Sequence, residues 1–87
     1  MNDSCVDVQC ADYQVTSASI AHSPGGAVFR CTIGPVTAEV LQRLDAVARS
    51  HGTIRLIFPK EPLLLERIEV RRIEPEYVRI RGQIVSV

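Results

Sequence analysis

The stretch LLLERIEVRRIEPEYVRIRGQIVSV, residues 63–87, alternates apolar and charged side chains almost without interruption. This period of two is typical of β-strands with one buried and one solvated face. Ile73-Glu74-Pro75 interrupts the alternation, so we expect a long β-hairpin that turns there. Most of its charged residues are arginine. The question is whether this arginine face binds a partner or is only the solvated side of a sheet.

The register of the hairpin follows if apolar residues must oppose apolar residues. Val70 then opposes Val78, and Glu69 opposes Arg79, so that apolar and charge pairing agree. A bulge near Pro75 would shift this pairing by one residue, since proline cannot adopt the left-handed conformation favoured in a three-residue loop. On this register the core face carries Leu64, Ile68, Val70, Val78, Ile80 and Ile84.

Glu66 is out of place on this core face, where it would lie opposite Gly82. Burying a lone carboxylate is costly unless it is paired. Two interpretations stay open: Glu66 is a functional acid, or it sits at the rim of the sheet beyond the cover of the helix. The rim is the more common place for such a residue.

The opposite face of the hairpin divides into two zones. The arginine zone consists of Arg67, Glu69, Arg71, Tyr77, Arg79 and Arg81, and the apolar zone consists of Leu63, Leu65 and Val85. The apolar zone would need a cover, either the N-terminal arm, a second copy of the chain or another protein. Arginine and tyrosine beside apolar residues are typical of protein interfaces. We therefore predict that a partner contacts Leu63, Leu65, Arg67, Arg71, Tyr77, Arg79, Arg81 and Val85.

The rest of the chain supplies two further strands, a helix and a third strand. Residues 13–22 and 27–33 read as strands joined by the turn sequence SPGG. Gly34-Pro35 opens a helix that ends at Gly52, and its apolar residues recur at helical spacing. Residues 53–59 form the next strand. Residues 1–12 are expected to be an irregular arm.

This order predicts a single α+β domain over residues 13–87, with the elements β-β-α-β-β-β. One helix of about four turns covers one face of a small sheet. The expected architecture is a two-layer sandwich, with one helix packed on a mostly antiparallel sheet. The short connections around the helix would make the strands on either side of it parallel if they share that sheet.

Composition narrows the class of protein. The 87 residues carry ten basic and ten acidic side chains, and the net charge of zero argues against a protein that coats DNA. The N-terminus lacks the pattern of a secretory signal, and no apolar run is long enough to cross a membrane. We expect a cytoplasmic protein whose three cysteines are reduced thiols.

Candidate sites for chemistry are weak. Cys5 and Cys10, with His22 and His51, lack the spacing of a second ligand pair, so no metal is expected. The chain has no nucleophile elbow, phosphate-binding loop or HExxH motif, and we expect neither a cofactor nor an enzymatic activity.

Three functions are compatible with this composition and pattern. The favoured one is a non-enzymatic protein-interaction module: an inhibitor, an adaptor or an assembly subunit, binding a protein partner, a second copy, or both. The alternative is nucleic-acid binding by the arginine-rich ribbon, and an enzyme ranks third. Accessory proteins of phages and mobile elements are also small and lack a catalytic motif. This analogy rests on size and general character, and no particular residue supports it.

Overall fold

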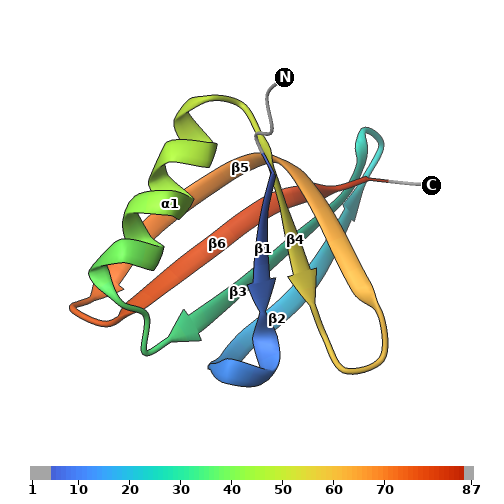
Figure 1. The fold of residues 1–87 in the computed structure, drawn as a ribbon. Coiled ribbons are helices and arrows are strands. Elements are labelled where there is room, and N and C mark those ends of the chain that lie inside the picture. The colour runs from blue at the N-terminus through green and yellow to red at the C-terminus, as the bar shows by residue number, and fades with distance from the viewer. Residues whose placement is uncertain (1–4, 86–87) are drawn as a thin grey trace.

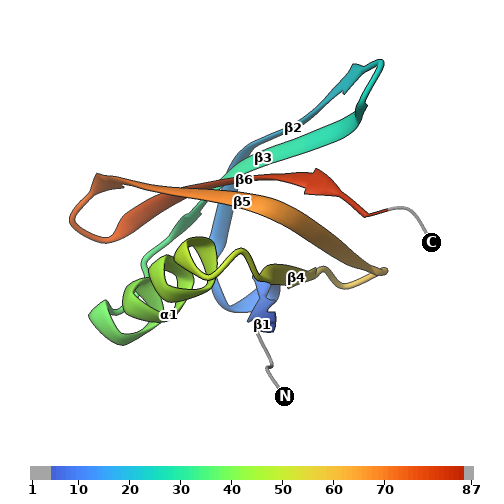
Figure 2. The same cartoon turned by 90° about the horizontal axis from the view of Figure 1, so that it is seen from above.

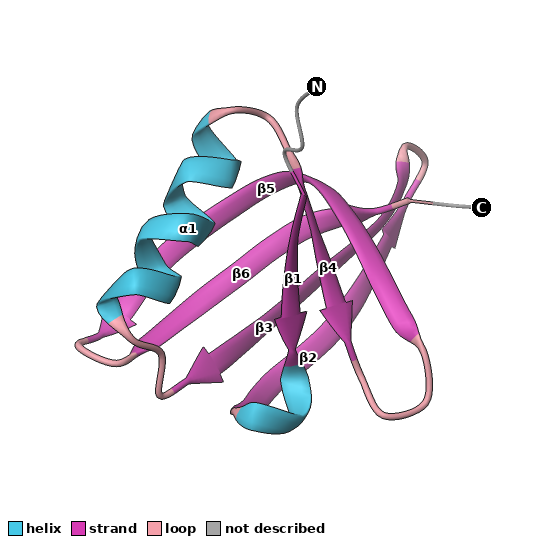
Figure 3. Ribbon diagram, viewed as in Figure 1, coloured by secondary structure: helices cyan, strands magenta, loops and turns pink. Residues whose placement is uncertain are grey.

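The computed structural model describes residues 5–85 of the chain. Figures 1 and 3 show one α-helix against a curved sheet. The elements in this range are β1 (Cys5–Gln9), the short 3-10 helix η1 (Cys10–Asp12), β2 (Gln14–Ser23), β3 (Gly26–Gly34), α1 (Ala38–Arg49), β4 (Thr53–Ile57), β5 (Pro62–Glu74) and β6 (Tyr77–Ile84).

The strands form one six-stranded sheet in the order β1-β4-β5-β6-β3-β2. Four of its five pairings are antiparallel, and β1 pairs with β4 in parallel. The prediction of one helix on a mostly antiparallel α+β sheet is confirmed. The strands flanking the helix, β3 and β4, do share the sheet, but β6 and β5 lie between them. All three pairings from β3 to β4 are antiparallel, so β3 and β4 run in opposite directions and the expectation that they are parallel is wrong.

Strand β5 is bent, and because of this bend the strands that pair with its first half lie on the same side as the helix. Figure 2 shows α1, β1 and β4 on the same side of β5 and β6. The core lies between two layers. One layer consists of α1, β1 and β4, and the other consists of β3, β6 and the second half of β5. The face of β3, β6 and β5 that points away from the helix is called the outer face below.

Helix α1 begins later than the sequence indicates. Its first residue is Ala38, and Thr37 is the N-cap, with Oγ1 accepting a hydrogen bond from the Val40 amide at 3.2 Å. This cap satisfies one of the amides that lack a partner in the first turn. The Val36 amide donates instead to the carbonyl of Glu76 at 2.8 Å, which ties the entry of the helix to the β5–β6 turn.

Residues 5–12 do not form the irregular arm predicted for residues 1–12, of which residues 1–4 lie outside the described part of the chain. Cys5–Gln9 forms strand β1, and Val6 and Val8 pair with Ile54 and Leu56 of β4. Val8 is buried against the core, with 3% of its surface exposed. The alternation in this five-residue segment is too short to identify a strand by itself, and its partner lies more than forty residues further along the chain.

An ion pair joins strands β1 and β4 on the solvent-exposed side of their parallel pairing. The guanidinium of Arg55 donates two hydrogen bonds to the carboxylate of Asp7, at 3.1 and 2.9 Å. These bonds hold the pKa of Asp7 below its usual value of 3.8. Both side chains are exposed to solvent, so their contribution to stability is small.

We predict that Asp7→Asn lowers stability slightly at neutral pH and has no effect in strong acid. A carboxylate with a depressed pKa in the folded protein stabilises it above its unfolded pKa, and the effect disappears as the pH falls through the folded pKa. Urea midpoints of the two proteins should therefore differ at about pH 6 and converge at about pH 2. A difference that persists unchanged in acid would contradict this role for the ion pair.

The register of the β5–β6 hairpin differs from the predicted one. Val70 opposes Ile80, not Val78, and Glu69 opposes Arg81, not Arg79. The pairing also shifts between Glu66 and Glu69, where Arg67 has a positive φ of 55°. This β-bulge reverses the alternation of side chains along the first part of β5.

The bulge exchanges the two faces of β5 at its start. Leu65, predicted on the outer face, is completely buried, while Leu64, predicted in the core, is half-buried and opposes the exposed Arg55. Glu66 is exposed and opposes Gln83, so it is not a buried acid. Gly82 makes the bulge possible, because a Cβ atom there would lie within 2.9 Å of both Leu65 and Ile68.

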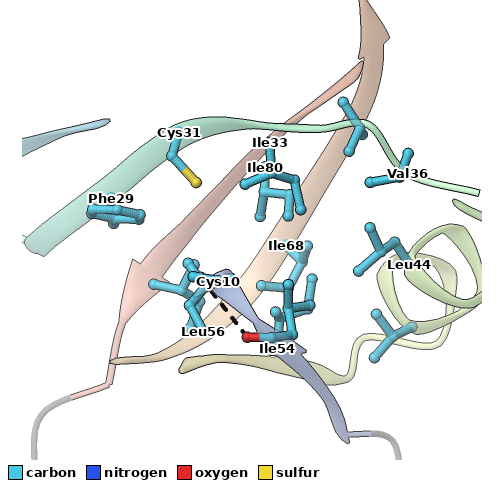
Figure 4. Packing of buried hydrophobic residues seen from close by; sticks show 14 residues of the cluster. Cys10, Phe29, Cys31, Ile33, Val36, Leu44, Ile54, Leu56, Ile68 and Ile80 are labelled. Carbon is cyan, nitrogen blue, oxygen red and sulfur yellow. Dashed lines mark hydrogen bonds between the residues drawn. The ribbon is translucent and has the colours of Figure 1, made fainter. Parts of the chain in front are cut away.

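The buried residues of the core are apolar and come from every strand except β2, from α1 and η1, and from Val36 before the helix (Figure 4). Val15 of β2 is partly buried and packs against them. Phe29 of β3 and Phe58, which follows β4, meet edge to face with their ring centroids 6.1 Å apart. The buried residues are Val8, Cys10, Phe29, Cys31, Ile33, Val36, Leu44, Val47, Ile54, Leu56, Leu65, Ile68, Val78 and Ile80. Across residues 5–85, no helix has the length and apolar character that a membrane span requires.

Candidate partner-binding face

The outer face carries arginines from three neighbouring strands. Arg30 of β3 opposes Arg81 of β6, and Arg81 opposes Glu69 of β5. Residues that oppose each other across a sheet share one face, with Cβ atoms about 5 Å apart. These three side chains therefore form a continuous row across the sheet.

A second row lies two residues further along the strands. Thr32 of β3 opposes Arg79, and Arg79 opposes Arg71 of β5. The two rows enclose a polar depression of about 320 Å³. We call its charged residues the arginine cluster: Arg30, Arg71, Arg79 and Arg81, together with Glu69.

The arginine cluster is strongly positive, although the whole protein is neutral. Four arginines and one glutamate give it a local charge of +3, whereas the net charge of the chain is zero. Among residues 5–85, the one ion pair of the cluster joins Arg81 to Glu69 at 3.4 Å, and the side chains are 52% and 71% exposed. A pair this long and exposed neutralises little charge. Within the described range, Arg30, Arg71 and Arg79 form no ion pair, so an anionic partner can meet their guanidinium groups.

Tyr77 has a structural role that its sequence context does not reveal. Its ring lies over Gly34, where a Cβ atom would collide with it. The hydroxyl then donates a hydrogen bond to Oε1 of Gln14 at 3.1 Å, linking β6 to β2 across β3. Tyr77 is half-buried and lies two residues before Arg79 on β6, so both side chains lie on the same face of that strand.

The remaining predicted contact residues separate into two groups. Arg67 is exposed at the bulge and lines a second small hollow beside Glu69 and Arg81. Leu65 belongs to the core, and Leu63 opposes the buried Leu56, so both leucines lie on the core side of β5 and the predicted apolar zone is absent from the outer face. Val85 is half-buried and donates its amide to the carbonyl of Leu64 at 3.0 Å.

Arg30 belongs to the face but is missing from the sequence prediction. Its alternation with Phe29 and Cys31 indicates that it points away from the core. The sequence does not show that β3 lies beside β6, which is what brings Arg30 to the cluster. The sequence therefore indicates that Arg30 faces solvent. It does not indicate that Arg30 shares a site with the arginines of the β5–β6 hairpin, because that depends on the order of the strands in the sheet.

The cysteines are thiols with different environments. Burial raises the pKa of Cys31 to about 12 and also raises the pKa of Cys10. Cys10 donates a weak hydrogen bond to the carbonyl of Val8, with 3.8 Å between sulfur and oxygen (Figure 4). Cys5 is exposed. Within the described part of the chain, no three His, Cys, Asp or Glu side chains are grouped so as to hold a metal ion.

Comparison of the chain with protein-family models, with curated proteins and with solved structures finds no significant match.

Proposed function

We propose that this protein is a non-enzymatic binding module whose arginine cluster engages an acidic surface on a partner protein. The observation that carries the proposal is the concentration of charge. A neutral chain places four arginines on three adjacent strands of one exposed face, with a single glutamate among them. Arginine suits this role because its planar guanidinium donates paired hydrogen bonds to a carboxylate.

The mixed character of the face favours a protein partner over nucleic acid. Glu69 lies within the cluster and Glu66 is exposed on the same strand, so a continuous phosphate backbone would meet two carboxylates. The one tyrosine at the cluster, Tyr77, is held over Gly34 and is not free to stack on a base. A protein surface can instead place single carboxylates opposite the arginines and leave Glu69 facing solvent or a cation.

Nucleic-acid binding is the second candidate, because the local charge of the cluster would also attract phosphate. Under the favoured hypothesis of a protein partner, the module acts as an inhibitor, adaptor or assembly subunit, of the kind that phages and mobile elements encode. We place it in the cytoplasm, a reducing compartment that suits three unpaired cysteines.

The test is the double charge reversal Arg79→Glu with Arg81→Glu. Both substitutions lie on the outer face, and we expect the fold to survive with surface-scale losses. The control is Arg43→Glu with Lys60→Glu, which changes the net charge equally at exposed positions outside the cluster. Binding of a fluorescent oligoglutamate peptide and of duplex DNA is measured by anisotropy across a salt series.

We expect the wild type and the control to bind the oligoglutamate peptide, and the double reversal to weaken this binding by about tenfold or more. Duplex DNA should show little affinity at physiological salt. Sub-micromolar DNA binding that falls steeply with salt and is abolished by the double reversal would favour the nucleic-acid function instead. Equal peptide binding by all three proteins would overturn the role of the cluster.

A further inference from the structure

Strand β2 forms one edge of the sheet, and within residues 5–85 it pairs only with β3. Figure 2 shows the end of the β2–β3 hairpin extending away from the helix and from β1. The pairing with β3 is irregular between Thr16 and Ser19, where Ser17 has a positive φ of 54°. Beyond this irregularity, Ser19–Ser23 pairs without interruption. We call this segment the free β2 edge.

The backbone of this segment has groups that point outward. Ser23 opposes Gly26 across a two-residue turn, and Ile20 and His22 oppose Phe29 and Ala27. In such a hairpin the residues next to the turn exchange hydrogen bonds, and the pattern alternates from there. Ile20 and His22 therefore direct their amide and carbonyl groups away from β3, toward the open side of the sheet.

The free β2 edge has no charged residue to prevent another strand from pairing with it. Proteins usually protect a sheet edge with charge, proline or a short strand. The other edge of this sheet is protected in that way, because β1 has five residues and carries Asp7. In contrast, residues 13–29 contain no Asp, Glu, Lys or Arg, and β2 has ten residues.

An apolar surface accompanies this edge. Ile20 is 51% exposed, the highest value among the large apolar side chains of residues 5–85. It lines an apolar groove of about 480 Å³ with Leu63 and the segment 58–62 that follows β4. A strand added beside β2 would place alternate side chains on the same side as Ile20, against this groove.

We propose that a second copy of the chain pairs antiparallel with this edge, with Ala21 opposite Ala21 of the other copy on a two-fold axis. This register uses the whole regular segment, since Ser19 then opposes Ser23, and Ile20 opposes His22. The outward groups of Ile20 and His22 in both copies make about four backbone hydrogen bonds. The two sheets join into one continuous sheet.

A second copy is the occupant because the edge is complementary to itself. In a two-fold arrangement each residue meets a residue from the same short segment. A charged segment would repel its own copy, whereas Ser19–Ser23 consists of small, polar and uncharged residues around Ile20. The contact is small, so we expect a weak dimer that forms at high concentration.

The test uses opposite charges at Ala21, which is exposed on the outer face. Ala21→Lys and Ala21→Glu each place two like-charged side chains directly opposite each other at the two-fold axis, with their Cβ atoms about 5 Å apart. Sedimentation velocity from about 1 μM to 1 mM should show concentration-dependent dimers for the wild type and monomers for each variant. An equimolar mixture of the two variants should dimerise again. Gln42→Lys and Gln42→Glu on the exposed side of α1 are the control pair and should dimerise like the wild type.

A monomeric wild type across this range would overturn the proposal. So would dimerisation of either Ala21 variant alone, since the contact would then lie elsewhere. Recovery in the mixture also excludes misfolding as the cause of monomeric variants. The arginine cluster is not altered in these proteins, so the result is independent of the binding to an acidic partner proposed above.

Discussion

Leu65→Ala is expected to lower the free energy of unfolding by about 2–5 kcal/mol. Leu65 is completely buried, and its side chain lies against Gly82, where β5 bulges toward β6. Removing it leaves a cavity that the rigid sheet around the bulge cannot close. Chemical denaturation monitored by circular dichroism measures the loss directly.

The neighbouring Leu64→Ala is the matched control for this prediction. Leu64 lies on the other face of β5, opposite Arg55, and is half-buried. Its truncation should cost about 1 kcal/mol. If Leu64→Ala were the more damaging substitution, the bulge would be absent and the register expected from simple alternation would be right. The pair of variants therefore measures which face of β5 points into the core.

Alkylation of the native protein should modify Cys5 rapidly. Cys31 should react at least about a thousandfold more slowly than Cys5. Cys31 is completely buried, and burial raises its pKa to about 12, so that the reactive thiolate is scarce. Reaction then requires the protein to open, which a domain with several kcal/mol of stability does rarely. Cys5 is exposed and needs no opening.

The measurement is a time course with iodoacetamide at about pH 8, where an ordinary thiol is partly ionised, followed by mass spectrometry of the peptides. Cys10 is also buried and should be protected like Cys31. In concentrated urea all three cysteines should react at similar rates, which controls for intrinsic reactivity. Rapid modification of Cys31 without denaturant would show that β3 separates easily from the rest of the core.

The two proposed surfaces use different parts of the same sheet. The arginine cluster lies on β3, β6 and β5, whereas the free β2 edge lies at the end of the β2–β3 hairpin. A dimer joined at β2 would place the two clusters on one continuous sheet. Such a dimer could contact two acidic sites at once, which would raise the apparent affinity without new contacts.

The sequence by itself determined the elements whose pattern is local. The apolar residues at helical spacing predicted a helix with one buried face, and α1 buries Leu44 and Val47 on that face. SPGG predicted the β2–β3 turn, and the long alternation predicted the β5–β6 hairpin. In each case neighbouring residues decide the structure, because helical and extended backbones repeat over a few positions. This was enough to establish the α+β class and the presence of arginines on a solvated face.

Only the tertiary structure decided the register of β5, the strand β1 and the membership of the arginine cluster. The bulge at Arg67 depends on how Leu65 and Ile68 pack on Gly82, which alternation alone does not describe. A glycine within a strand signals a close approach, yet it does not say which residue approaches. Strand β1 needs β4 as its partner, and Arg30 joins the cluster because β3 lies beside β6. These features depend on contacts between residues far apart in the chain, and such contacts are chosen by the packing of the whole core and not by any local stretch.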